Sequence, residues 1–215
     1  MGFTIGGIRE MRPGARRRGR AAGATAVAEY TGLWGWAVVP GARLSAGVCS
    51  CGAPDCAAPG AHPLDGADEI PAGSTLREAA DAWSQHPGAS LLLPVGRAFD
   101  VLDVPEVPGR RALVRMERMG LPAGPVAVAP DGRVQFFVAP GAAAELPGLL
   151  YRMGWDDAGL DLRAPGPGAF LTAPPSELGP LGPVRWLRAP APDTAAAPPQ
   201  ARLLLGTLAY ICHRW

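Results

Sequence analysis

Val126-Ala-Val-Ala-Pro-Asp-Gly-Arg-Val-Gln-Phe-Phe-Val138 is the stretch that fixes the fold class of this chain. Two apolar runs, 126–129 and 134–138, flank Pro130-Asp131-Gly132-Arg133. Asp-Gly between apolar runs is typical of a tight turn that joins two antiparallel strands. The stretch therefore predicts a β-hairpin, and with it a sheet that is at least partly antiparallel.

Helices and further strands are predicted on both sides of this hairpin. Apolar residues at helical spacing predict helices over 24–33, 75–86 (with Ser74 as the N-cap), 110–119 and 201–212, and a short helical turn over 149–153. Continuous apolar runs predict buried strands over 36–39, 90–95 and 99–104, and a second hairpin pairs 160–163 with 169–172. Because helices and strands are mixed and hairpins dominate the second half, we expect an α+β fold with a mixed or antiparallel sheet and flanking helices.

Length and charge indicate that the chain is one domain with additional segments at both ends. The 215 residues are enough for one substantial core. Residues 1–20 carry six Arg and one acidic residue and are expected to be a disordered basic arm, whereas residues 21–215 carry fourteen Arg and eighteen acidic residues. An acidic body does not favour a basic face for duplex binding. We expect the domain to span 24–188, followed by a Pro/Ala linker over 189–199 and a C-terminal helix over 200–215.

Three thiols and one imidazole lie close together in a Gly/Pro-rich loop over 41–73. The loop contains Cys49-Ser-Cys51-Gly-Ala-Pro-Asp-Cys56, and His62 follows six residues later. Zn²⁺ prefers four such ligands in a tetrahedron, so we expect a structural Zn²⁺ site; the alternative is a reduced loop without metal. Clustered cysteines suit a reducing compartment, and no apolar run has the length of a membrane span. The expected location is therefore the cytoplasm, with no membrane association.

Several motifs occur in an order that is characteristic of one family. They are Gly35-Trp36, the Cys-x-Cys-x4-Cys loop leading to Pro59-Gly-Ala-His-Pro63, Trp83 with Pro87, Val101-Leu-Asp-Val104, Asp-Gly-Arg before Phe136-Phe137, and Leu160-Asp-Leu-Arg163 leading to Ala173-Pro-Pro-Ser176. Over roughly 24–188 this order resembles the N-terminal domain of bifunctional DNA primase/polymerases (prim-pol), in the archaeo-eukaryotic primase superfamily. The resemblance implies a prim-pol core and a nucleotidyltransferase whose three carboxylates hold two Mg²⁺ or Mn²⁺ ions.

The sequence departs from that pattern at positions that matter for catalysis. Asp103 matches the first carboxylate of an Asp-x-Asp pair, but Pro105 stands at the second position, and Asp161 matches the third. Glu106 is a substitute only if the chain turns sharply at Pro105. Val134 stands where the family has a His that seats the triphosphate.

Other residues of the matching motifs are expected to contact the nucleotide. The resemblance assigns nucleotide binding to Arg133, Arg163 and Ser176. Two simpler interpretations stay open: Asp103 caps the end of its strand, and Asp161 forms an ordinary surface ion pair with Arg163.

The sequence thus predicts a prim-pol-like domain with a degenerate active site that is weakly active or inactive. Whether the chain is an enzyme stays open, because a nucleotidyltransferase that uses Asp103, Asp161 and Glu106 is a second hypothesis. A third is a zinc-stabilised module that binds nucleic acid or protein without catalysis, aided by the basic arm. The implied partners are DNA and nucleoside triphosphates. Because this chain has no room for a helicase, we expect it either to work alone on a limited task or to act with a separate replication partner protein.

Overall fold

The hairpin at 126–138 lies at the centre of a four-stranded antiparallel sheet in the computed structural model, which describes residues 23–215. The strand order is β5 (Asp100–Pro105), β7 (Arg133–Val138), β6 (Val126–Ala129) and β9 (Arg185–Arg188). A second antiparallel sheet contains β1 (Val39–Gly41), β4 (Ser90–Pro94) and β8 (Phe170–Thr172), and β2 (Leu44–Ser45) pairs with β3 (Val48–Cys49). The α+β class with antiparallel sheets is confirmed. The expected basic arm, 1–20, lies outside the described residues.

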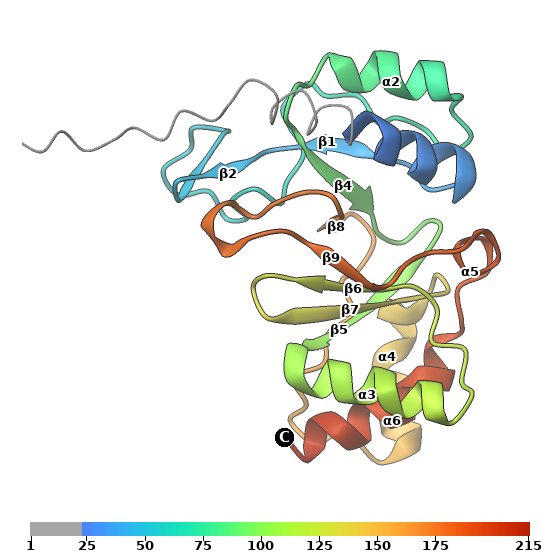
Figure 1. The fold of residues 1–215 in the computed structure, drawn as a ribbon. Coiled ribbons are helices and arrows are strands. Elements are labelled where there is room, and N and C mark those ends of the chain that lie inside the picture. Colours follow the sequence, from blue (N-terminus) through green and yellow to red (C-terminus); the bar gives the residue numbers. More distant parts are fainter. Residues whose placement is uncertain (1–22) are drawn as a thin grey trace, which may run out of the picture.

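Helices flank the two sheets on different sides (Figure 1). Three helices cover one face of the four-stranded sheet: α3 (Glu106–Arg118), α4 (Ala142–Met153) and α6 (Ala201–His213). A helical segment over 23–33, whose last part is the π-helix η1 (Glu29–Leu33), and α2 (Leu76–Ser84) lie near the three-stranded sheet. Two short helices, η2 (Gly179–Leu181) and α5 (Pro192–Ala196), lie in the connections on either side of β9.

Strand alternation divides the core into two clusters. Leu102, Val104 and Phe136 point to the side of α3 and α6, where they are fully buried. Val101 and Phe137 point to the other side, where the Phe137 ring stacks on Trp36 with centroids 5.3 Å apart. Side chains two residues apart share a face of a strand, so Asp103, which lies two residues after Val101, faces the space between the two sheets.

α3 begins earlier than predicted because prolines are tolerated in a first helical turn. Pro105 is the N-cap residue and Pro108 lies in that turn, so the helix starts at Glu106 and not at 110. Gly109 brings α3 close to the sheet: a Cβ there would lie 2.8 Å from the Cβ of Val134. Only a glycine fits that approach without displacing its neighbours.

The predicted second hairpin is wrong. β8 pairs with β4 of the other sheet, and 160–163 makes a single bridge, between Asp103 and Arg163. The reason is burial: Leu162 belongs to the cluster under α3 and α6, and Leu171 to the cluster between the sheets. The Pro-rich connection therefore carries the chain from one sheet to the other.

Other boundaries also differ from the prediction. α4 has twelve residues, not a single turn, although Pro147 lies inside it. Thr75, not Ser74, caps α2, and it forms a capping box with Glu78. Segment 189–199, expected as a linker, contains α5, in which Ala195 is buried and its carbonyl accepts a hydrogen bond from Trp36 Nε1 at 3.2 Å.

Candidate functional site

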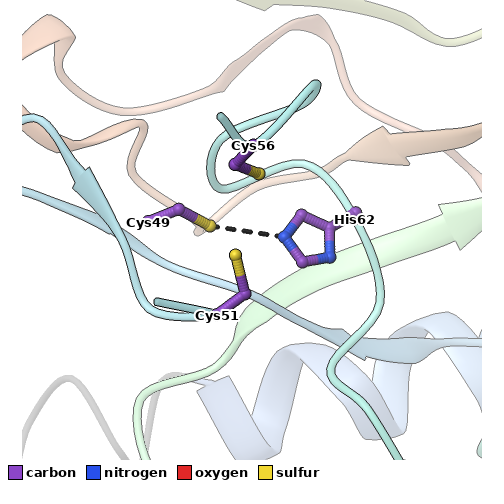
Figure 2. Close-up of side chains that lie close together, drawn as sticks. All are labelled: Cys49, Cys51, Cys56 and His62. Carbon is purple, nitrogen blue, oxygen red and sulfur yellow. Dashed lines mark hydrogen bonds between the residues drawn. The ribbon is translucent and has the colours of Figure 1, made fainter. Parts of the chain in front are cut away.

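The four predicted Zn²⁺ ligands converge on one point (Figure 2). Cys49 ends β3, Cys51 and Cys56 follow in the loop, and His62 returns beside them from the segment that bridges to Gly41. One ligand atom of each residue lies within 4.8 Å of the others, and Cys49 Sγ is 3.3 Å from His62 Nε2. Thiolates about 2.3 Å from a tetrahedral Zn²⁺ are about 3.8 Å apart, so the cluster has the size of a metal site.

The imidazole of His62 is already oriented for such a role. Its Nδ1 donates a hydrogen bond to the Pro63 carbonyl at 2.8 Å, because a carbonyl only accepts. The Nε2 atom therefore points to the thiols, which is the usual arrangement of a metal-binding histidine.

The thiols also have shifted proton affinities. Burial would raise the pKa of Cys49, but the N–H groups of Cys51 and Gly60, together with His62, lower it to about 6. The hydrogen bond to Cys49 raises the pKa of His62. Burial and the neighbouring thiols raise the pKa of Cys56. A cluster with a thiol this acidic can supply the thiolate that a metal ion requires.

The two predicted catalytic carboxylates also meet, at the edge of the four-stranded sheet. Asp103 lies on β5, and the backbone of Asp103 pairs with that of Arg163: each N–H donates to the other's carbonyl, at 2.8 and 2.9 Å. This pairing places Asp161 beside Asp103, although 160–163 is not a regular strand.

A single guanidinium bridges the two carboxylates. Arg133, at the start of β7, donates from Nε to Asp103 Oδ1 at 2.6 Å and from a terminal nitrogen to Asp161 Oδ2 at 2.7 Å. A third donor reaches the Asp103 carbonyl at 3.1 Å. The Arg133 and Asp103 side chains are 15% and 13% exposed, whereas Asp161 is 50% exposed. The expected ion pair between Arg163 and Asp161 is also present, at 3.4 Å.

Burial and charge act in opposite directions in this cluster. Burial raises the pKa of the Asp103 carboxyl, and the Arg133 guanidinium offsets only part of that rise. Burial would lower the pKa of Arg133, but the carboxylates of Asp161 and Asp103 raise it above its ordinary value. Arg133 therefore stays charged as the counter-ion of the pair, while Asp103 is the member whose charge is disfavoured.

The remaining predicted residues lie elsewhere. The Glu106 carboxylate accepts from Arg110 Nε at 2.7 Å on α3. The Ser176 hydroxyl accepts from the Leu91 N–H at 2.7 Å and, within residues 23–215, makes no hydrogen bond to either carboxylate. Val134, at the position of the family's histidine, is fully buried among the residues under α3.

Two polar residues to which the sequence assigned no role are buried on the strands that carry Asp103 and Arg133. Asp100 Oδ2 accepts from the N–H groups of Gly141 and Ala143 at the start of α4, at 3.0 and 3.1 Å. Gln135 pairs with Asp103 across the sheet, and its Oε1 is buried without a hydrogen-bond partner. The Asp100 cap depends on contacts 41 and 43 residues distant in the sequence, which no local pattern indicates. A lone Gln in an apolar strand gives no functional signal either.

Neither the curated proteins nor the solved structures gave a match. Across the part of the chain that the structure describes, no helix is both long and apolar enough to cross a membrane. The family model for the N-terminal domain of bifunctional DNA primase/polymerases matches residues 27–201, which contain both the Cys/His cluster and the bridged carboxylates. This match covers most of the chain, and the chain belongs to the prim-pol family.

Proposed function

We propose that this chain is a prim-pol domain whose nucleotidyl-transfer site is degenerate and catalytically inactive or nearly so. The family acts on DNA and nucleotides, and the shared fold brings Asp103 and Asp161 together. The observation that carries the proposal is the position of Arg133, whose guanidinium donates a hydrogen bond to one oxygen of each carboxylate. In the family's chemistry these carboxylates hold divalent ions, and here an internal guanidinium pairs with both of them.

The residues present do not fit a two-metal site. Such a site needs carboxylates that can bridge two ions about 4 Å apart. Pro105 supplies no ligand, Glu106 is paired with Arg110, and Asp100 caps α4 on the other face of β5. A metal would also have to displace Arg133, whose three hydrogen bonds are charge-assisted or directed at a carbonyl.

Primer extension on a primed single-stranded template, with Mg²⁺ or Mn²⁺, tests this proposal. We expect the full chain to incorporate no more nucleotide than its Asp103→Asn/Asp161→Asn variant. Robust extension that disappears in Asp103→Ala would overturn the proposal. If that activity also disappears in Glu106→Ala, the chain is the active nucleotidyltransferase that the sequence left open.

A second candidate function is a zinc-stabilised binding module, and the Cys/His cluster favours it. A loop with so few apolar side chains gains its shape from ligands, and these four ligand atoms lie within 4.8 Å of one another. Metal analysis should find one Zn²⁺ per chain in protein purified under reducing conditions. Limited proteolysis then compares the metal-free protein with the same protein after Zn²⁺ addition. If the loop is equally resistant to protease in both samples, Zn²⁺ has no structural role.

A further inference from the structure

The two packed helices α3 and α6 concentrate positive charge on an otherwise acidic body. Residues 106–118 and 201–215 hold six of the fourteen Arg in 21–215 but only two of the eighteen acidic residues. The rest of 21–215 therefore holds eight Arg against sixteen acidic residues. The net charge of residues 21–215 is negative and does not favour nucleic-acid binding, but the surface of α3 and α6 is locally positive.

Most of these arginines have no carboxylate partner. Glu106 pairs with Arg110 at 2.7 Å, and Glu117 pairs with Arg188 of β9 at 3.8 Å. Within residues 23–215, no carboxylate lies within salt-bridge distance of the exposed side chains of Arg111, Arg115 and Arg118. These three follow one another at i, i+4 and i+7, so they form one stripe along the outer side of α3.

Aromatic rings of α6 and the residues after it hold part of this stripe in place. The guanidinium of Arg111 lies 4.4 Å from the centroid of the Trp215 ring, and that of Arg115 lies 5.4 Å from the Tyr210 ring. Arg214 approaches Tyr210 at 5.5 Å and donates to its hydroxyl at 3.0 Å. A guanidinium that stacks on a ring keeps the N–H donors of its edge free, so Arg111 and Arg115 are oriented and still able to bind phosphate.

The stripe borders a groove of about 660 Å³ that also has apolar walls. Val114, Met119 and Ile211 line it together with the arginines, and Val114 and Met119 are 46% and 48% exposed. We propose that this surface binds single-stranded nucleic acid, with phosphates on the arginines and unstacked bases against the apolar side chains. A duplex would offer the charge without free base faces, whereas a single strand offers both.

This inference does not depend on whether the nucleotidyl-transfer site is active. The surface does not include Asp103, Asp161 or Arg133. The binding assay can therefore give a positive or negative result whatever the primer-extension assay shows.

Fluorescence anisotropy with a labelled oligothymidylate tests the proposal on the full chain, arm included. Arg111→Gln, Arg115→Gln and Arg118→Gln are combined in one variant, whose exposed side chains carry no core packing. Each lost phosphate contact lowers the slope of log K against log salt by about 0.7 for a single strand, so we expect a slope smaller by about 2 and a Kd about tenfold higher or more.

The matched control removes the same charge from exposed arginines outside this surface, with Arg43→Gln, Arg77→Gln and Arg152→Gln. It should retain the wild-type slope and Kd. Equal losses in the two triple variants would mean that binding follows net charge alone, and the proposal would be wrong. A poly-glutamate peptide is tested in the same way. If it binds as tightly as the oligonucleotide and loses affinity equally in the α3 triple variant, the surface binds an acidic protein partner and the proposal is wrong.

Footprinting of the unmodified protein gives an answer without any variant. Phenylglyoxal modifies accessible arginines, and mass spectrometry locates the labelled sites. The oligonucleotide should protect Arg111, Arg115 and Arg118 and leave Arg152 reactive. Protection confined to residues 1–20 would place the contact on the arm and refute the proposal.

Discussion

Replacement of Arg133 by Met is the most direct test of the idea that an internal cation holds the two carboxylates together. Met keeps the aliphatic bulk but leaves Asp103, which is 13% exposed, facing Asp161 without a counter-ion. Removal of one partner of a buried ion pair costs about 3–5 kcal/mol. Because Asp161 is half exposed and can turn to water, we expect the lower end, about 3 kcal/mol.

Scanning calorimetry measures this cost. For a domain of this size, 1 kcal/mol corresponds to about 2–4 °C, so Tm should fall by about 6–12 °C. Arg163→Met is the matched control, because its side chain is 70% exposed and 3.4 Å from Asp161. An exposed pair of this kind contributes less than about 1 kcal/mol. Equal losses in the two variants would refute the bridging role of Arg133.

The pH dependence separates lost charge pairing from lost packing. Burial already raises the pKa of Asp103 in the folded protein, and removal of Arg133 should raise it further. A carboxyl whose folded-state pKa exceeds its unfolded value stabilises the fold below the unfolded pKa, and this contribution is lost as pH rises through the folded pKa. The loss of stability in Arg133→Met, relative to the wild-type protein, should therefore be smaller at about pH 4, near the ordinary pKa of Asp, than at neutral pH.

A second substitution gives the same distinction at neutral pH. Asp103→Asn in the Arg133→Met background removes the uncompensated charge, so the double variant should be more stable than the single one. If its stability is the same or lower, lost packing and not the charge of Asp103 explains the deficit.

Three further predictions concern other parts of the molecule. Asp100→Ala leaves two N–H groups of α4 uncapped and should cost about 2 kcal/mol in urea unfolding, whereas the exposed Asp157→Ala should cost less than about 0.5 kcal/mol. Thr75→Ala breaks the capping box of α2 and should cost about 1 kcal/mol, whereas Ser74→Ala should be close to neutral; equal effects would contradict the observed cap. His62→Ala removes one of four ligand atoms, so elemental analysis should find the bound Zn²⁺ reduced at least tenfold under mild chelation; unchanged occupancy would place the metal elsewhere.

Local signals in the sequence predict well where the physical cause is itself local. The hairpin at 126–138 is predicted because an Asp-Gly turn and its two flanking apolar runs are signals within a few residues. The meeting of Cys49, Cys51, Cys56 and His62 is predicted because all four lie in one loop. α4 is the exception: Pro147 and Gly148 conceal a helix that is stabilised by its contacts with β5 and α6.

Contacts between distant segments explain what the sequence could not predict. The motif order places Asp103 and Asp161 in one site only through the family resemblance. The bridge by Arg133 depends on the register of β5 against β7, in which Pro105 lies opposite Arg133, and on the return of 160–163 to β5. The second hairpin fails for a related reason, because Leu162 and Leu171 are buried in different clusters. No pattern within 160–172 indicates that Leu162 and Leu171 are buried on different sides of the four-stranded sheet.

Under the proposal that the active site is degenerate, Arg133 would explain how a prim-pol fold persists without catalytic metal. Two carboxylates that converge at the edge of a sheet repel each other, and burial makes the charge of Asp103 costly. A divalent ion offsets that cost only while it is bound, whereas a guanidinium fixed by three hydrogen bonds offsets part of it in every folded molecule. The interaction that stabilises this edge is therefore the same one that would compete with metal binding. The nucleic-acid binding that we propose for α3 and α6 requires neither carboxylate, so it would be retained if catalysis were lost.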